Sequence, residues 1–157
     1  MHIICSFNPF LMKKYLLYLV LLGACTNAPT SVAYTYIRNT TNKQVVIINF
    51  YPFSSATIFT IEPQQSLLVK TEAIGGVSGD DPPDVGFDIK YIDSTVVSFS
   101  DGKNLQFLAT DLLAEHNILN PDNFIQTGTA HSNHYFSKTR QTYYTYTLTQ
   151  KDYENAR

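Results

Sequence analysis

The segment STVVSFSDGKNLQFLA, residues 94–109, decides the fold class of this 157-residue chain. Two short runs with alternating apolar residues flank Asp101-Gly102, and such alternation is typical of half-buried strands. An Asp-Gly pair favours a type I′ turn, because both of its residues can adopt a positive φ. The segment therefore predicts an antiparallel hairpin and a protein built mainly from β-strands.

The rest of the chain repeats this pattern at intervals that suit a small all-β domain. The run QVVIINFY (44–51) is apolar on both faces, as expected of a central strand, and EPQQ (62–65) has the length of a hairpin connector. No helix of ordinary length separates the runs, so we expect an antiparallel β-sandwich, Ig-like or transthyretin-like, in a single domain over residues 34–157. Further strands are expected at 34–40, 57–61, 66–71, 85–92, 133–140 and 141–149.

Two other segments favour short helices. DLLAEHNILN (111–120) has helical spacing of its large apolar residues and is expected to form one or two helical turns, which Pro121 ends. Near the C-terminus, Thr149 is expected to cap a helix over residues 150–157, with Asp152 at the third position of a capping box.

The N-terminal region has the layout of a cleaved secretory signal. Lys13 and Lys14 precede the apolar run 15–22, which is about half as long as a membrane-spanning helix. We therefore expect residues 1–24 to be a signal helix that is removed. Residues 1–11 fit no part of such a signal, and Met12 is the expected true start of the chain.

The stretch Leu22-Gly23-Ala24-Cys25 resembles the lipobox of bacterial lipoproteins. The resemblance implies cleavage between Ala24 and Cys25, a diacylglyceryl group on the Cys25 thiol, and an acylated new amino terminus. Cys25 has no other cysteine to pair with after cleavage, and the small polar residues 26–33 are expected to form a flexible tether.

Several stretches of the mature chain, together with the lipobox, resemble a group of small uncharacterised lipoproteins common in Bacteroidota. These stretches are YIRNTTNKQVVI, DSTVVSFSDGKNLQF, NILNPDNF and YYTYTLTQKDYENA. The resemblance implies a β-sandwich on an outer-membrane anchor and carries no catalytic residue. Surface-exposed lipoproteins of that lineage tend to have acidic residues directly after the cysteine. Residues 26–28 include none, which favours the periplasmic side of the outer membrane.

The charge of the mature chain argues against polyanionic partners. Removing Lys13 and Lys14 with the signal lowers the formal net charge from −2 by two, to −4. A negative chain is not expected to bind nucleic acid, nor does its overall charge favour an anionic membrane surface. Contact with the membrane is therefore expected through the lipid at Cys25.

No motif predicts a catalytic residue, cofactor or metal. In GGVSG the nucleophile pattern around Ser78 fails, because Asp80 stands where a glycine is required. The acidic loop 80–88 favours a solvated turn over a calcium site, since its spacing is not that of an EF-hand. His131 and His134, three residues apart, would face opposite sides of a strand, and exposed loop histidines are favoured over a zinc site.

Tyrosines are the best candidates for ligand contact. In the run 141–149, Tyr144 and Tyr146 share a face with Leu148 and are expected in the core, whereas Tyr143 faces the other side. An outward tyrosine can stack on a sugar ring or form a protein contact. Tyr143 and Tyr135 are therefore the candidate ligand-facing residues.

Two short patterns indicate covalent modification. Asp93-Ser94-Thr95 matches the acceptor pattern of Bacteroidota O-glycosylation, with Ser94 as the modified residue. Asn39-Thr40-Thr41 matches the N-glycosylation pattern, which matters only where the compartment has that machinery.

We expect a non-enzymatic, lipid-anchored envelope protein that acts through protein–protein contact. A first alternative is a glycan-binding module that uses exposed tyrosines. A second is a small envelope hydrolase with paired carboxylates, whose separation the sequence does not give.

Overall fold

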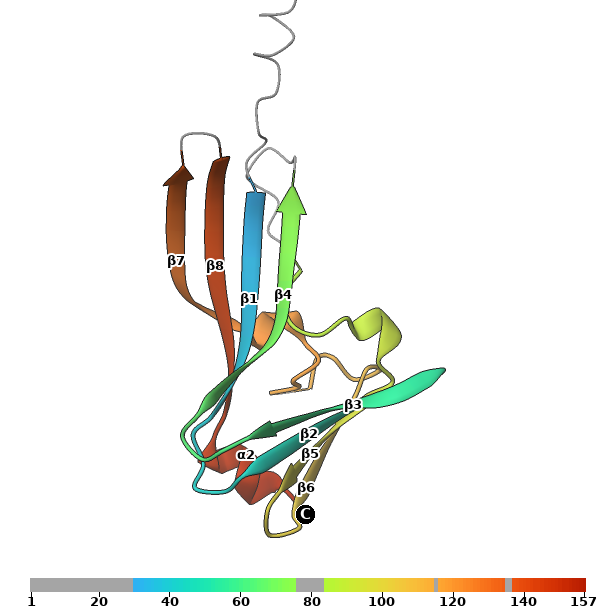
Figure 1. The fold of residues 1–157 in the computed structure, drawn as a ribbon. Coiled ribbons are helices and arrows are strands. Elements are labelled where there is room, and N and C mark those ends of the chain that lie inside the picture. The colour runs from blue at the N-terminus through green and yellow to red at the C-terminus, as the bar shows by residue number, and fades with distance from the viewer. Residues whose placement is uncertain (1–29, 76–83, 115, 135–136) are drawn as a thin grey trace, which may run out of the picture.

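The computed structural model describes residues 30–75, 84–114, 116–134 and 137–157. Eight strands form two four-stranded sheets, coloured along the chain in Figure 1. Sheet A has the order β4-β1-β8-β7, and sheet B has the order β3-β2-β5-β6. The strands are β1 (Thr30–Asn39), β2 (Val45–Tyr51), β3 (Ser54–Ile61), β4 (Ser66–Gly75), β5 (Ser94–Phe99), β6 (Asn104–Leu108), β7 (Ile125–His134) and β8 (Ser137–Leu148).

The helical content is small. In the described part of the chain, one α-helix, α2 (Gln150–Asn155), follows β8, and two single 3₁₀ turns lie at Ile89–Tyr91 and Pro121–Asn123. The predicted capping box of α2 is confirmed: the Thr149 side chain accepts from the Asp152 backbone N–H, and the Asp152 carboxylate accepts from the Thr149 N–H. A mainly β fold of two sheets with a short C-terminal helix is therefore confirmed.

Sheet A is mixed, so the prediction of purely antiparallel sheets is wrong for this half of the protein. β1 pairs antiparallel with β4 but parallel with β8, in the register Thr30↔Thr139 to Asn39↔Leu148. A parallel pair needs a long connection, and here the whole of sheet B lies between the two strands in the chain. Such pairing of distant segments leaves no local trace in the sequence.

One apolar core joins both sheets. β1 and β8 contribute Ile37 and Leu148, and β2 and β5 contribute Ile47 and Val97, all fully buried. Burying such side chains is the main stabilising term in the folding of a domain. β2 lies between β3 and β5, so the predicted central strand is confirmed.

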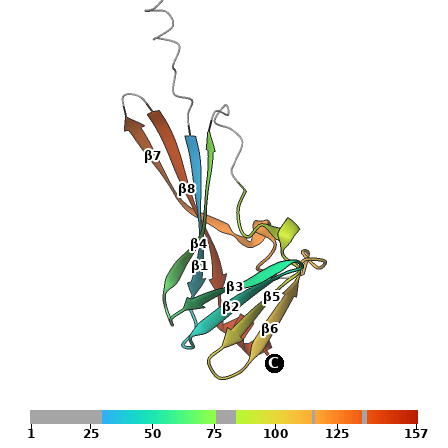
Figure 2. The same cartoon turned by 45° about the vertical axis from the view of Figure 1, so that its right-hand side comes forward.

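Sheet A extends well beyond this core. In Figures 1 and 2 its upper part, where β1 begins and β4 ends, projects away from sheet B. β1 begins at Thr30, four residues before the predicted strand start at Tyr34, so less chain separates the first strand from Cys25 than expected. Ala24 and Cys25 themselves lie outside the described residues.

The hairpin at residues 94–109 is confirmed, but its turn differs from the prediction. β5 and β6 pair from Ser94↔Leu108 to Ser98↔Asn104. Gly102 has φ +91. A type I′ turn would also require a positive φ at Asp101, and Asp101 does not have one. The Gly102 N–H donates to the Phe99 carbonyl and the Phe99 N–H to the Lys103 carbonyl, which is the three-residue loop with a left-handed glycine at its end.

The connector at 62–65 is not a hairpin. β3 pairs with β2 and β4 pairs with β1, so these four residues carry the chain from sheet B to sheet A. Asn39, at the opposite crossing, donates from Nδ2 to the carbonyls of Lys43, Ile61 and Glu62. One buried amide thus ties both crossings together.

Three further local predictions are wrong. Residues 85–92 form bends and a 3₁₀ turn, because Gly86 takes φ +83 and lies against the Phe124 ring, which breaks the strand pattern. Residues 111–114 and 116–120 form i→i+3 turns in place of the expected one or two helical turns, with His116 at φ 57. The expected break at residue 140 is absent, and β8 runs unbroken from Ser137 to Leu148 and pairs with β7.

Candidate functional site

The outer face of sheet B carries six apolar side chains and no charged one at its paired strand positions, and its polar members are Thr60, Ser94, Ser98, Asn104 and Gln106. Alternate residues of the four strands point away from the core, and the register places Ile58, Ile48 and Val96 side by side in one row. Phe50, Ser94 and Leu108 form the next row. We define the apolar face as Val46, Ile48, Phe50, Ile58, Val96 and Leu108.

This apolar face is uncovered in the part of the chain that the structure describes. None of its six residues belongs to the buried core or packs against it, and Ile58 is 63% exposed. Phe53, in the turn between β2 and β3, is 99% exposed. A contiguous apolar patch on a protein surface is typical of an interaction site, whereas single exposed apolar side chains are common.

The outer face of sheet A carries a second group of large side chains. Tyr34 of β1 and Tyr143 of β8 are register partners, and their rings stack with centroids 5.3 Å apart and planes 15° apart. Tyr36, two residues further along β1, points to the same side. We call Tyr34, Tyr36 and Tyr143 the tyrosine face.

The predicted positions of the C-terminal tyrosine side chains, in the core or on the outer face, are partly confirmed. Tyr146 is buried and Tyr144 packs against the core, while Tyr143 is half-buried on the outer face. The structure adds Tyr34 and Tyr36, which the sequence alone did not single out. Their alternation in YTYI was visible, but only the parallel pairing of β1 with β8 brings them to Tyr143. Tyr135 lies outside the described residues.

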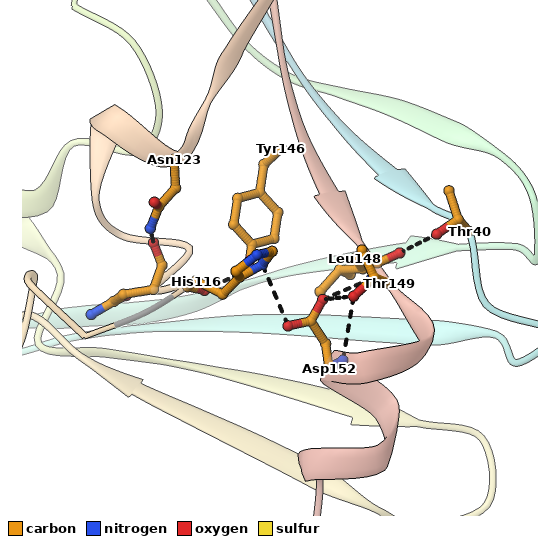
Figure 3. A network of polar contacts seen from close by, with 8 residues as sticks. Thr40, His116, Asn123, Tyr146, Leu148, Thr149 and Asp152 are labelled. Atoms are coloured by element: carbon orange, nitrogen blue, oxygen red, sulfur yellow. Dashed lines mark hydrogen bonds and ion pairs between the residues drawn. The ribbon is translucent and has the colours of Figure 1, made fainter.

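A polar network around His116 joins the loop before β7 to β8 and α2 (Figure 3). The Tyr146 hydroxyl donates to the His116 carbonyl at 2.6 Å, and Nδ1 of His116 lies 3.6 Å from Oδ1 of Asp152. Oδ2 of Asp152 accepts from both the N–H and the hydroxyl of Thr149, each at 2.7 Å. The Thr149–Asp152 contacts of this network were predicted as a capping box, but the contacts of His116 with Tyr146 and Asp152 were not, because these residues are far apart in the chain.

The contacts of this network hold the His116 loop against β8 and α2. The Asp152 carboxylate is almost fully buried and both of its oxygens are engaged. Burial, and secondarily the charge of Asp152, raises the pKa of the Tyr146 hydroxyl, which therefore stays a hydrogen-bond donor.

The His116 side chain is half exposed and lines two small hollows. One, of about 180 Å³, also involves Lys151 and Asn155, and the other, of about 340 Å³, involves Asp122 and Thr147. The first hollow is smaller than an ordinary small-molecule pocket, and the second is at the lower limit of that size range. The left-handed backbone of His116 is held in place by the Tyr146 hydrogen bond.

The acidic loop is only partly described. Asp80 and Asp81 lie outside the described residues, and Asp84 is exposed. Asp88 accepts a hydrogen bond from Lys70, which also contacts Glu72 at 2.6 Å. Burial lowers the pKa of Lys70, but its bonds to these two carboxylates outweigh that effect and raise the pKa overall. Among the described residues, no group of three His, Cys, Asp or Glu could hold a metal ion.

The two predicted modification sites differ in accessibility. Ser94 begins β5 and is half-buried on the outer face of sheet B, beside Phe50 and Leu108. Asn39 is fully buried with its amide nitrogen fully used, so the folded protein cannot be N-glycosylated there. His131 and His134 both belong to β7, so the expectation of loop histidines is wrong.

No protein-family model, curated protein or solved structure matches this chain. Among the described residues, no helix is long and apolar enough to cross a membrane.

Proposed function

We propose that this chain is a lipid-anchored β-sandwich protein of the bacterial outer membrane that binds another envelope protein and catalyses no reaction. The apolar face of sheet B carries the proposal. It presents six large apolar residues without a charge, and nothing in the described chain covers it. Apolar area removed from water contributes about 25 cal/mol per Å², so a partner with a matching apolar surface would gain substantially from docking.

The contact is tested by a photo-crosslinking amino acid placed at Ile58 in living cells. We expect one discrete crosslinked product, because Ile58 lies in the middle of the apolar face and is well exposed. The matched control is the same amino acid at Thr71, an exposed position on the outer face of sheet A, which should give no such product.

A second substitution makes the result specific to the face. Leu108→Asp places a charge on the apolar face at a 46% exposed position, so folding should persist while the crosslink from Ile58 disappears. The proposal is refuted if Ile58 gives no product, or if its product is unchanged by Leu108→Asp.

The proposed anchor has its own test. Cys25→Ala should abolish labelling by a fatty-acid probe, because the thiol that would carry the diacylglyceryl group is gone. Labelling at the wild-type level in that variant would overturn the anchor. On the periplasmic side, the domain should also resist protease added to intact cells.

The stacked tyrosines favour glycan binding as a second candidate function. Tyr34 and Tyr143 lie side by side on a sheet face, which suits stacking against a sugar ring. A glycan array separates the two functions. Binding that is lost in Tyr143→Ala but kept in Ile58→Asp would support the tyrosine face, and an array without any bound glycan would exclude this candidate.

A further inference from the structure

We infer that the free edge of β3 pairs with the β3 edge of a second copy of this chain, so that the protein forms a two-fold symmetric dimer through sheet B. This pairing goes beyond the proposed function, because it uses the backbone edge of the sheet and not its apolar face. Figure 2 shows β3 at one margin of sheet B and β6 at the other.

Among the residues that the structure describes, the backbone of β3 is paired on one side only. Successive residues of an antiparallel strand direct their backbone groups to opposite sides. The Ser100 N–H donates to the carbonyl of Gln44, directly before β2, so the even-numbered residues of β2 face β5 and the odd-numbered ones face β3. These odd-numbered residues pair with odd-numbered residues of β3 from Thr57 onward. The N–H and C=O groups of Ile58 and Thr60 are therefore directed to the open edge.

The three other edges of the two sheets are interrupted or occupied. At the β6 edge, the N–H and the carbonyl of Asn104 both bond to Arg157. The register shifts within β4, which also carries Lys70 and Glu72, and it shifts within β7 as well. Irregular register, charges and covering segments are the means by which natural sheets prevent edge-to-edge pairing.

The second half of β3 lacks these protective features. Its register shift lies before Thr57, so the stretch from Thr57 to Ile61 pairs regularly with β2. The chain has no charged residue from Gln44 to Ile61, and both Ile58 and Thr60 are exposed. A regular, uncharged and exposed edge is a template on which another strand can pair.

A second copy of the chain fits this edge. Two antiparallel copies related by a two-fold axis present the same groups to each other, so one contact closes both edges. With the axis at Phe59, Ile58 lies opposite Thr60 of the second copy, and the free N–H and C=O groups of both residues are paired. An uncharged edge meets no like charge in its own copy, and β3 carries no charge that would select a different partner.

The proposed lipid anchor would strengthen this pairing. A junction of five residues from each strand is small beside a stable interface, which buries at least about 1,000 Å². Association of unanchored chains in dilute solution is therefore expected to be weak. Two copies anchored in one membrane meet at a much higher effective concentration, so we expect the dimer there.

The test uses the full lipidated protein in its native membranes and a short bismaleimide, which joins two nearby thiols. Wild type gives the baseline, because Cys25 would be blocked by its lipid and Cys5 removed with the signal. Ile58→Cys should give a product of twice the chain mass that joins two differently tagged copies. The matched control is Gln106→Cys, exposed on the same outer face at the opposite edge. In the dimer its two thiols would be seven strand spacings apart, about 34 Å, and should not be joined.

Substitutions at Thr60 in the Ile58→Cys protein test the role of the edge. Thr60→Pro removes an N–H that faces away from β2, so the fold should persist, as circular dichroism would show. Each copy loses one hydrogen bond across the axis, which should lower the association constant roughly thirtyfold. Thr60→Lys keeps the N–H but places a charge on the edge and should also lower the yield. Thr60→Val keeps the N–H without a charge and should leave the yield unchanged.

A yield from Ile58→Cys no higher than that from Gln106→Cys overturns the dimer. A yield that folded Thr60→Pro and Thr60→Lys proteins leave unchanged, or a product that contains a different protein, also overturns it. Leu108→Asp should abolish the photo-crosslink to another envelope protein and leave the bismaleimide product intact. A photo-crosslinked product of twice the chain mass counts for the dimer and not for the apolar face, so either proposal can fail while the other stands.

Discussion

Replacing Asn39 by alanine should loosen the point at which the chain crosses between the two sheets. Asn39 is fully buried at the end of β1. Its Nδ2 donates to the carbonyls of Lys43, Ile61 and Glu62 at 2.7, 3.3 and 3.2 Å. Its Oδ1 accepts from the N–H and the hydroxyl of Thr41 at 3.0 and 2.8 Å.

The size of the effect follows from these contacts. Each intramolecular hydrogen bond contributes about 1 kcal/mol, and a buried polar group left without a partner costs about 1–3 kcal/mol. Some orphaned carbonyls near the surface will find water, so we expect Asn39→Ala to lower the free energy of unfolding by about 3–5 kcal/mol. Domains of this size are stable by only about 5–15 kcal/mol in total.

Urea unfolding at neutral pH, followed by circular dichroism, measures this change. With an m-value of about 2 kcal/mol per molar, the midpoint should fall by roughly 2 M. The control is Asn42→Ala, an exposed residue of the same turn, which should change the free energy of unfolding by less than about 0.5 kcal/mol. A loss below about 1 kcal/mol for Asn39→Ala would refute the reasoning.

Asn39→Asp tests the direction of the hydrogen bonds. The new carboxylate would face three carbonyl oxygens in a buried site, so its pKa in the folded state is raised above the unfolded value. A raised carboxyl pKa stabilises the fold most below the unfolded pKa and loses that contribution as the pH rises. The variant should therefore be closest to wild type near pH 4 and weaker towards neutral pH.

Three further predictions concern single contacts. Tyr146→Phe removes the donor to the buried His116 carbonyl and should cost about 1–3 kcal/mol of unfolding free energy by urea titration. Gly102→Ala meets no atom within 4 Å, so only the strain of φ +91 should destabilise it, by about 1 kcal/mol in thermal melts. A hydrogen bond from Tyr153 lowers the pKa of Asp101; the stability that Asp101 adds relative to Asp101→Asn should be present above about pH 4 and vanish in stronger acid, as stability curves against pH would show.

The sequence predicted the parts of the fold that depend on neighbouring residues. The hairpin around Gly102, the central position of residues 45–51, and the cap formed by Thr149 and Asp152 are confirmed because their determinants lie within a few residues of each other. Periodicity and capping chemistry act at that range.

The misassigned parts depend on contacts between distant segments. EPQQ has the length of a hairpin loop, but the buried amide of Asn39 holds the residues beside it at a crossing between sheets. Residues 85–92 have a strand-like composition because Phe87 and Ile92 are buried, although they belong to a loop. A buried loop and a buried strand need the same apolar residues, so composition alone cannot separate them.

The candidate surfaces also consist of parts that local sequence predicts and parts that depend on contacts between distant segments. Tyr143 was placed correctly by the alternation of a single strand, whereas Tyr34 reaches it only through the parallel pairing of β1 with β8. Residues 45–51 carry apolar side chains on both sides of the strand. The structure covers only the side with Val45 and Ile47, and this difference is what reveals the apolar face.

The proposed anchor and the possible modification of Ser94 both limit how a partner can reach the apolar face. If Cys25 carries the lipid, the start of β1 lies near the membrane, and the ten residues of β1 extend about 33 Å from there, at 3.3 Å per residue. Sheet A then acts as a spacer, and a partner of the apolar face must reach well beyond the head groups. A glycan on Ser94 would lie within that face, beside Phe50 and Leu108, and would block docking. Modification of Ser94 and binding through the apolar face are therefore mutually exclusive, so a crosslink from Ile58 should come only from unmodified protein.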